Sequence, residues 1–126
     1  MRRKLVLSAV ISAMLLLTFV ACGGGGGSAL VGRWDAVSVE IIQDGESFTE
    51  NLSPGEMSME FFSDGNGVVV DGRNTDRFTW SAENGRLMIT DGWGTEVMDY
   101  SISRSTLTIT ITDNWGTEIM TFRRAN

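Results

Sequence analysis

Two tryptophans in a duplicated segment are the residues of this chain best suited to recognise a ligand or a partner. Residues 89–98 read ITDGWGTEVM, and residues 111–120, 22 positions later, read ITDNWGTEIM. Each copy places an indole, Trp93 or Trp115, between an aspartate and a glutamate. An indole face attracts cations and can anchor a protein partner. The duplicated segment therefore predicts a site for an apolar ligand, a cationic group or a protein.

Glutamates and methionines of the same repeat extend this candidate site. Glu96 and Glu118 fall in the inward-facing phase one residue inside each loop, and Met98 and Met120 follow in the same phase. The flexible thioether of methionine adapts to apolar ligands. The alternative is that the Asp and Gly residues are ordinary turn chemistry, the glutamates are solvated, and the tryptophans fold back over the core. Both interpretations stay open at this point.

The composition argues against catalysis and against nucleic-acid binding. The chain has 126 residues with no histidine and one cysteine, so it has no imidazole base, no Ser-His-Asp or Cys-His arrangement and no ordinary zinc site. Its formal charge of −6 would repel nucleic-acid phosphates. A calcium site among the acids is an alternative, although they lack EF-hand spacing. We expect no enzymatic activity, no cofactor, no metal site and no nucleic-acid partner.

The N-terminal residues have the layout of a bacterial secretion signal. Basic residues 2–4 precede an apolar run over 5–20 that is short for a membrane span. The run ends in FVAC at 19–22, which resembles the lipobox of bacterial lipoproteins with phenylalanine in place of the usual leucine. The resemblance implies that 1–21 is a lipoprotein signal peptide and that Cys22 is lipidated. The alternative is a plain signal peptide followed by a free cysteine.

A glycine-rich segment is expected to link the lipid anchor to the folded domain. Residues 22–29 hold the lipidated cysteine and a flexible linker, and the domain spans 30–126. Acyl chains bind a membrane through about 0.8 kcal/mol per buried CH2. We therefore expect an extracytoplasmic, lipid-anchored protein of the bacterial cell envelope. Without basic residues 2–4, seven arginines face 16 acids, a formal charge of −9 that disfavours anionic ligands.

Beyond the linker, apolar and polar residues alternate in the pattern of strands with one buried face. Leu107, Ile109 and Ile111, for example, alternate with threonines. Turn sequences such as Asp64-Gly65-Asn66-Gly67 separate the alternating runs at the spacing of hairpins. The pattern predicts eight strands, near 31–42, 57–63, 67–71, 76–82, 86–90, 95–103, 106–112 and 117–124.

The even number of strands predicts a closed barrel, because the last strand can then pair antiparallel with the first and remove the exposed edges. A ninth strand at Ser47–Asn51 would break this closure, so 43–56 is predicted to be a long loop, with or without a short lid. The repeats are expected to turn through four-residue loops at 91–94 and 113–116. The predicted fold class is all-β: an antiparallel eight-stranded up-and-down barrel after a signal peptide and a Gly-rich tether.

The motifs of this barrel resemble those of the lipocalins. Gly32-x-Trp34 is similar to the GxW motif that starts the first lipocalin strand, and the whole of 30–126 resembles the small lipocalin-like domains of bacterial lipoproteins. In lipocalins an arginine near the end of the barrel stacks on this tryptophan. By strand phase that arginine is Arg124, or Arg123 if a bulge intervenes. The resemblance thus implies a structural role for Gly32, Trp34 and Arg124. The other similar pieces are Phe61-x-x-Asp64-Gly65-x-Gly67, Trp80 leading to Gly85-x-Leu87-x-Ile89, Tyr100-x-Ile102 leading to Leu107-x-Ile109, and Phe122-Arg123-Arg124.

Two functions follow from this reading. An eight-stranded barrel holds only filling side chains or one small ligand. Many bulky inward residues favour a packed interior, whereas the methionines leave room for a small apolar pocket near the mouth. We expect a membrane-anchored lipocalin-like lipoprotein that binds a small apolar or cationic ligand at the barrel mouth. The alternative is a protein-binding or inhibitory module that uses the tryptophan-bearing rim of a filled barrel.

Overall fold

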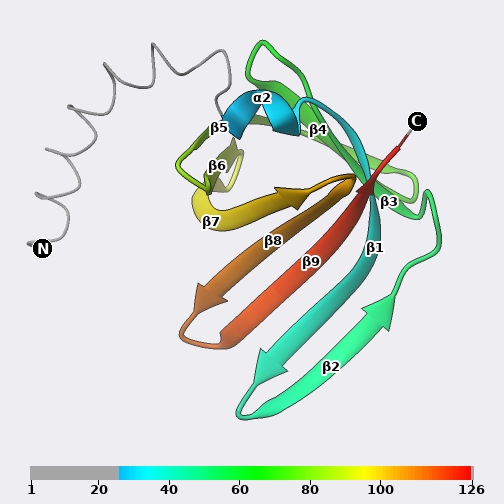
Figure 1. Cartoon of the computed structure of the whole chain (residues 1–126), viewed down its shortest axis with the longest axis vertical. Coiled ribbons are helices and arrows are strands. Elements are labelled where there is room, and N and C mark those ends of the chain that lie inside the picture. Colours follow the sequence, from blue (N-terminus) through cyan, green and yellow to red (C-terminus); the bar gives the residue numbers. More distant parts are fainter. Residues whose placement is uncertain (1–25, 126) are drawn as a thin grey trace, which may run out of the picture.

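The computed structural model describes residues 26–125 and shows an almost entirely β domain (Figure 1). The predicted signal peptide 1–21, the predicted lipidation site Cys22 and the first linker glycines lie outside the described residues. The elements are α2 (Gly26–Leu30), β1 (Gly32–Gln43), β2 (Glu46–Asn51), β3 (Met57–Phe61), β4 (Asn66–Asp71), β5 (Asn74–Glu83), β6 (Arg86–Asp91), β7 (Gly94–Ser103), β8 (Thr106–Asp113) and β9 (Gly116–Arg124).

Eight of the described strands form a closed antiparallel barrel, which confirms the predicted fold class. Neighbouring strands follow the order β1-β3-β4-β5-β6-β7-β8-β9, and β9 pairs back with β1 to close the ring. A bulge between Ala36 and Ser38 adds one residue to β1 at this closing seam. The bulge changes the inward phase of β1: Ala36 lies opposite the buried Phe122 before it, and Val39 lies opposite Met120 after it.

The prediction that 43–56 is a loop is wrong, because residues 46–51 form strand β2. This strand pairs with the second half of β1, from Ser38–Asn51 to Gln43–Glu46. The barrel still closes because β1 gives one edge to β9 and divides its other edge between β3, at residues 32–35, and β2. A ninth strand is therefore compatible with closure, because β1 does not pair with a single neighbour along the whole of this edge.

The end of the barrel near Trp34 is closed by a cation–π contact, as the resemblance implied. The guanidinium carbon of Arg124 lies 4.1 Å from the centre of the fully buried Trp34 ring. The same guanidinium donates hydrogen bonds to the carbonyl oxygens of Val31, at 3.1 Å, and Ala29, at 2.7 Å. The indole N–H of Trp34 donates to the carbonyl oxygen of Leu30, at 2.9 Å. These bonds hold the C-terminal end of α2 and the following Val31 across the barrel end.

Helix α2 lies against β5 at this closed end (Figure 1). The described structure therefore includes residues 26–29, which the sequence assigned to the linker. Gly32 begins β1 with φ of 127°, and a Cβ there would lie 2.8 Å from Nη1 of Arg124. Glycine at this position thus leaves room for the stacked arginine. Within residues 26–125, no helix has the length and apolar character needed to cross a bilayer.

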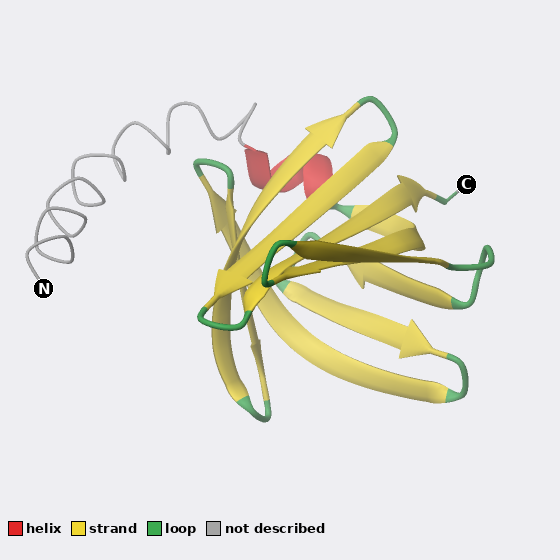
Figure 2. Ribbon diagram, turned by 90° about the horizontal axis from the view of Figure 1, so that it is seen from below, coloured by secondary structure: helices red, strands yellow, loops and turns green. Residues whose placement is uncertain are grey.

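Large apolar side chains fill the closed half of the barrel. The Phe61 ring makes edge contacts with Phe78, at 5.6 Å between ring centres, and with Trp80, at 5.2 Å. The strands surrounding this core spread apart toward the other end, where the hairpins project (Figure 2). The largest fully buried side chains are Trp34, Phe61, Phe122, Leu30, Leu87, Leu107 and Ile109.

Candidate functional site

The two repeated segments form the β6–β7 and β8–β9 hairpins. Both turns lie at the end opposite the closed one, because β9 runs from Gly116 at its turn to Arg124 beside Trp34. Asp91 pairs with Gly94 in the first hairpin, so its tip contains two residues and not the predicted four. The second hairpin has the same register, with Asp113 opposite Gly116. We call this end of the barrel the rim.

The aspartates of the repeats shape the turns. The Oδ1 atom of Asp91 accepts a hydrogen bond from the backbone N–H of Trp93, at 2.8 Å. The Oδ1 atom of Asp113 accepts one from the N–H of Trp115, also at 2.8 Å, and another from Gly116, at 3.2 Å. For the aspartates, the turn-chemistry interpretation is therefore correct, since the side chain stabilises the tip that carries the indole.

The tryptophans project into solvent and do not fold back over the core. Trp93 is 98% exposed and Trp115 is 78% exposed, whereas Trp34 is fully buried. Tryptophan side chains are highly buried on average, so two exposed indoles on neighbouring hairpins mark a candidate binding surface. The alternative in which these indoles cover the core is wrong, and they stand as two free aromatic groups on adjacent hairpins.

Each repeat builds a shallow recess beside its tryptophan from the same six positions. Both recesses combine an indole, an isoleucine and two carboxylates, which suits a group that is apolar and positively charged. The β6–β7 recess measures about 310 Å³ and the β8–β9 recess about 190 Å³. The first is lined by Ile89, Asp91, Trp93, Gly94, Thr95 and Glu96, and the second by Ile111, Asp113, Trp115, Gly116, Thr117 and Glu118.

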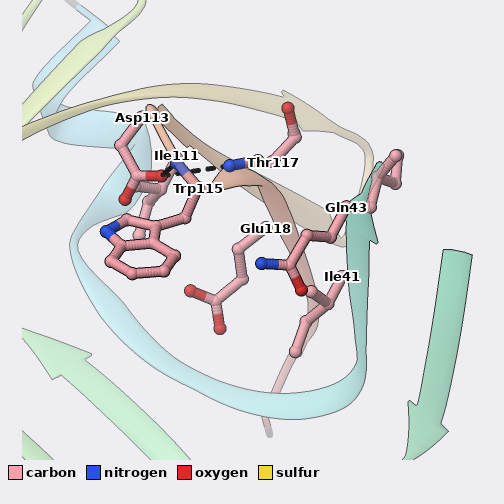
Figure 3. Close-up of a pocket in the computed structure, with 9 residues that line it drawn as sticks. Ile41, Gln43, Ile111, Asp113, Trp115, Thr117 and Glu118 are labelled. Carbon is pink, nitrogen blue, oxygen red and sulfur yellow. Dashed lines mark hydrogen bonds between the residues drawn. The ribbon is translucent and has the colours of Figure 1, made fainter. Parts of the chain in front are cut away.

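Strand β1 completes the recess at Trp115. It contributes Ile41, Ile42 and Gln43, which have no counterpart among the lining residues at Trp93. Figure 3 shows the Glu118 carboxylate and the Gln43 amide directed into the space beside the indole. Ile41 lies opposite Glu118 in the strand register. The sequence predicted closure of the barrel but not the strand register after the bulge in β1, which brings these residues beside Trp115.

The rim is strongly acidic. Three of its hairpins, covering residues 37–51, 89–97 and 111–119, carry eight carboxylates and no basic residue, while the β4–β5 hairpin carries both signs. The ion pairs formed within residues 26–125 join Arg33 to Asp35 and Arg86 to Asp99, so neither neutralises these carboxylates. Such a field attracts cations. The eight are Glu40, Asp44, Glu46, Glu50, Asp91, Glu96, Asp113 and Glu118.

The predicted ligand-binding residues separate into two groups. Glu96 and Glu118 line the recesses with the tryptophans. Met98 is buried in the core and Met120 is half-buried against it, and neither lines a recess. The alternation of side chains along each strand predicted that these two glutamates and two methionines face inward. Their position along the strand decides which of them reach the rim. Residues 26–125 contain no group of three or more His, Cys, Asp or Glu side chains able to hold a metal ion.

We found no family model, curated protein or solved structure that matches this chain.

Proposed function

We propose that this protein is a non-enzymatic binding module of the bacterial cell envelope, attached to a membrane through a lipid on Cys22, and that its rim recognises a cationic protein partner. The observation that carries this proposal is the exposure of Trp93 and Trp115 on a barrel whose closed half is filled. Exposed aromatic anchors of this kind commonly dominate protein interfaces.

The size of the Trp115 recess favours a partner's side chain over a whole small molecule, and the recess at Trp93, at about 310 Å³, reaches only the lower limit of small-molecule pockets. Typical small-molecule pockets measure about 300–1,000 Å³ and enclose most of the ligand, whereas the recess at Trp115 measures about 190 Å³. A lysine or arginine side chain fits this volume, with its stem against Ile111 and its charge between the indole and Glu118. The duplicated recess offers the same chemistry to a second basic side chain.

The place at which the described chain begins is compatible with this role. The described chain begins in α2 at the closed end, and the rim lies at the opposite end of the barrel. A lipid attached upstream of α2 would therefore leave the rim accessible.

Binding of pentalysine to the purified protein tests the proposal, measured by isothermal titration calorimetry at low and high salt. We expect the double variant Trp93→Ala/Trp115→Ala to bind about 5- to 30-fold more weakly, because each exposed cation–π contact contributes about 0.5–1 kcal/mol. The paired Trp→Phe variant is the control and should retain part of the affinity. Added salt should weaken binding to every variant by screening the carboxylates. Equal affinity of the wild type and the double alanine variant would contradict the proposal.

A small cationic ligand is the second candidate, and the enclosure of the Trp115 recess by β1, β8 and β9 favours it. Tetramethylammonium, a compact apolar cation, is a suitable probe of this recess. We expect Trp115→Ala to abolish its binding if this candidate is correct, and Trp93→Ala to leave it unchanged, since the Trp93 recess lacks the β1 wall. Native mass spectrometry of the purified protein would detect a natural ligand that co-purifies.

A further inference from the structure

Strand β2 presents an unpaired edge beside the rim. It pairs with β1 on one side, and among residues 26–125 no strand pairs with its other side. All six residues of β2 are exposed. Free strand edges can pair with another chain, and they are usually blocked by charged side chains, above all lysine, by proline or by a covering segment. The sequence of β2, ESFTEN, contains neither lysine nor proline, and its two charged residues are both acidic, so they oppose an acidic strand but not a basic one.

The hairpin geometry identifies the backbone groups that face outward from this edge. Asp44 and Gly45, with φ of 54° and 78°, form a two-residue turn closed by the pair Gln43–Glu46. Hydrogen-bonded and non-hydrogen-bonded pairs alternate from that position. The N–H and C=O groups of Phe48 therefore point to β1, whereas those of Thr49 point to the open side.

The inward face of β2 has an apolar centre with an acidic residue on each side. Phe48, 62% exposed, lies opposite Ile41, 45% exposed, which also lines the Trp115 recess. Glu46 and Glu50 share this face with Phe48, because side chains two residues apart lie on the same side of a strand. An added strand would thus meet a carboxylate, a phenyl ring and a second carboxylate along one face.

We propose that an extended basic segment of a partner protein adds to β2 as a further antiparallel strand. Its backbone would bond to the outward groups of Ser47, Thr49 and Asn51, as in other cases of strand addition. Lysine or arginine side chains would lie opposite Glu46 and Glu50, with an apolar side chain opposite Phe48.

Charge complementarity selects this occupant. A second copy of the chain pairing through β2 would bring its own glutamates close to Glu46 and Glu50, and like charges on neighbouring strands are destabilising. Oppositely charged cross-strand pairs are stabilising. The inference rests on the proposed function and adds that the partner supplies an extended segment as well as basic side chains.

The peptide acetyl-Thr-Lys-Thr-Val-Thr-Lys-Thr-amide tests this inference, because its lysines and valine match the face of β2. We expect saturable binding in isothermal titration calorimetry and slower amide hydrogen exchange at Thr49. Thr49→Pro removes one outward N–H and should weaken binding about tenfold, while Thr49→Ala keeps the N–H and should bind like the wild type. An N-methyl group on the third residue of the peptide, which lies opposite Thr49 and directs its N–H toward β2, should weaken binding similarly. This second variant keeps the test valid if Thr49→Pro fails to fold.

Three results would overturn the inference: no saturable binding of the peptide, equal affinity of Thr49→Pro and Thr49→Ala, or a dimer of the protein that Thr49→Pro abolishes. If Thr49→Pro is neutral while the tryptophan double variant loses pentalysine binding, the inference fails and the proposed function stands. If Thr49→Pro weakens peptide binding while the tryptophan variants bind pentalysine normally, the edge binds but the proposed role of the tryptophans fails.

Discussion

Replacement of one repeat glycine by alanine should destabilise this protein more than replacement of its equivalent in the other repeat. Gly94 and Gly116 occupy the same position in their hairpins and have similar φ values, 137° and 150°. A Cβ on Gly94 would meet no heavy atom within 4 Å. A Cβ on Gly116 would overlap the carbonyl oxygen of Ile42 and lie 3.2 Å from its carbonyl carbon. Closure of the barrel therefore brings the backbone of β1 against only one of the two glycines.

Two separate effects determine how much each substitution lowers the free energy of unfolding. A non-glycine residue held at such φ costs about 1–3 kcal/mol, and both variants bear this cost. Gly116→Ala must also move β1 away from β9, and overpacking of this kind costs about 1–3 kcal/mol more. We expect Gly94→Ala to lower the free energy of unfolding by about 1–3 kcal/mol and Gly116→Ala by about 2–6 kcal/mol. The difference between the variants isolates the contact with Ile42.

Urea unfolding of the purified proteins, followed by circular dichroism and by tryptophan fluorescence, measures both changes. The midpoint should fall more for Gly116→Ala than for Gly94→Ala, with similar denaturant slopes. Equal shifts in midpoint would refute the close approach of β1 and β9 at this position. Weaker binding of tetramethylammonium by Gly116→Ala alone would further indicate that the same displacement opens the Trp115 recess.

Two further predictions concern the closed end and the alkaline pH range. Arg124→Ala should lower the free energy of unfolding by about 2–4 kcal/mol, because it removes a stacking contact and two charged hydrogen bonds. The exposed Arg123→Ala is the control and should change it by no more than about 0.5 kcal/mol in urea unfolding. Burial raises the pKa of Tyr100 above its ordinary value of 10.0, so the stability that its neutral phenol contributes is complete below pH 10 and is lost as pH rises through the raised pKa. Because Tyr100 is the single tyrosine of the chain, the ultraviolet absorbance of its phenolate reports this pKa directly, and titration at or below pH 10 would contradict the prediction. Tyr100→Phe should remove this part of the alkaline loss of stability.

Local patterns were sufficient to predict most of the barrel. Alternation of apolar and polar residues identified the eight barrel strands, since inward and outward positions alternate along any strand with one buried face. The lipocalin resemblance implied an arginine beside Trp34 and strand phase selected Arg124, which lies opposite Trp34 in the β1–β9 register. The duplicated segment predicted both tryptophan hairpins, because the conformation of a tight turn is determined by the few residues within it. Strand alternation and turn sequences depend on residues that are close together in the chain, so they can be identified from the sequence alone.

The differences between the two repeats were decided by the tertiary structure. Their sequences are nearly identical, yet β1 lines only the Trp115 recess and closely approaches only Gly116. The reason is that barrel closure places β1 beside β9 and not beside β7. Strand β2 likewise depends on the part of the β1 edge that β3 leaves free. Sequence alone determined which residues form the two tryptophan hairpins, whereas long-range strand pairing determined what surrounds each one.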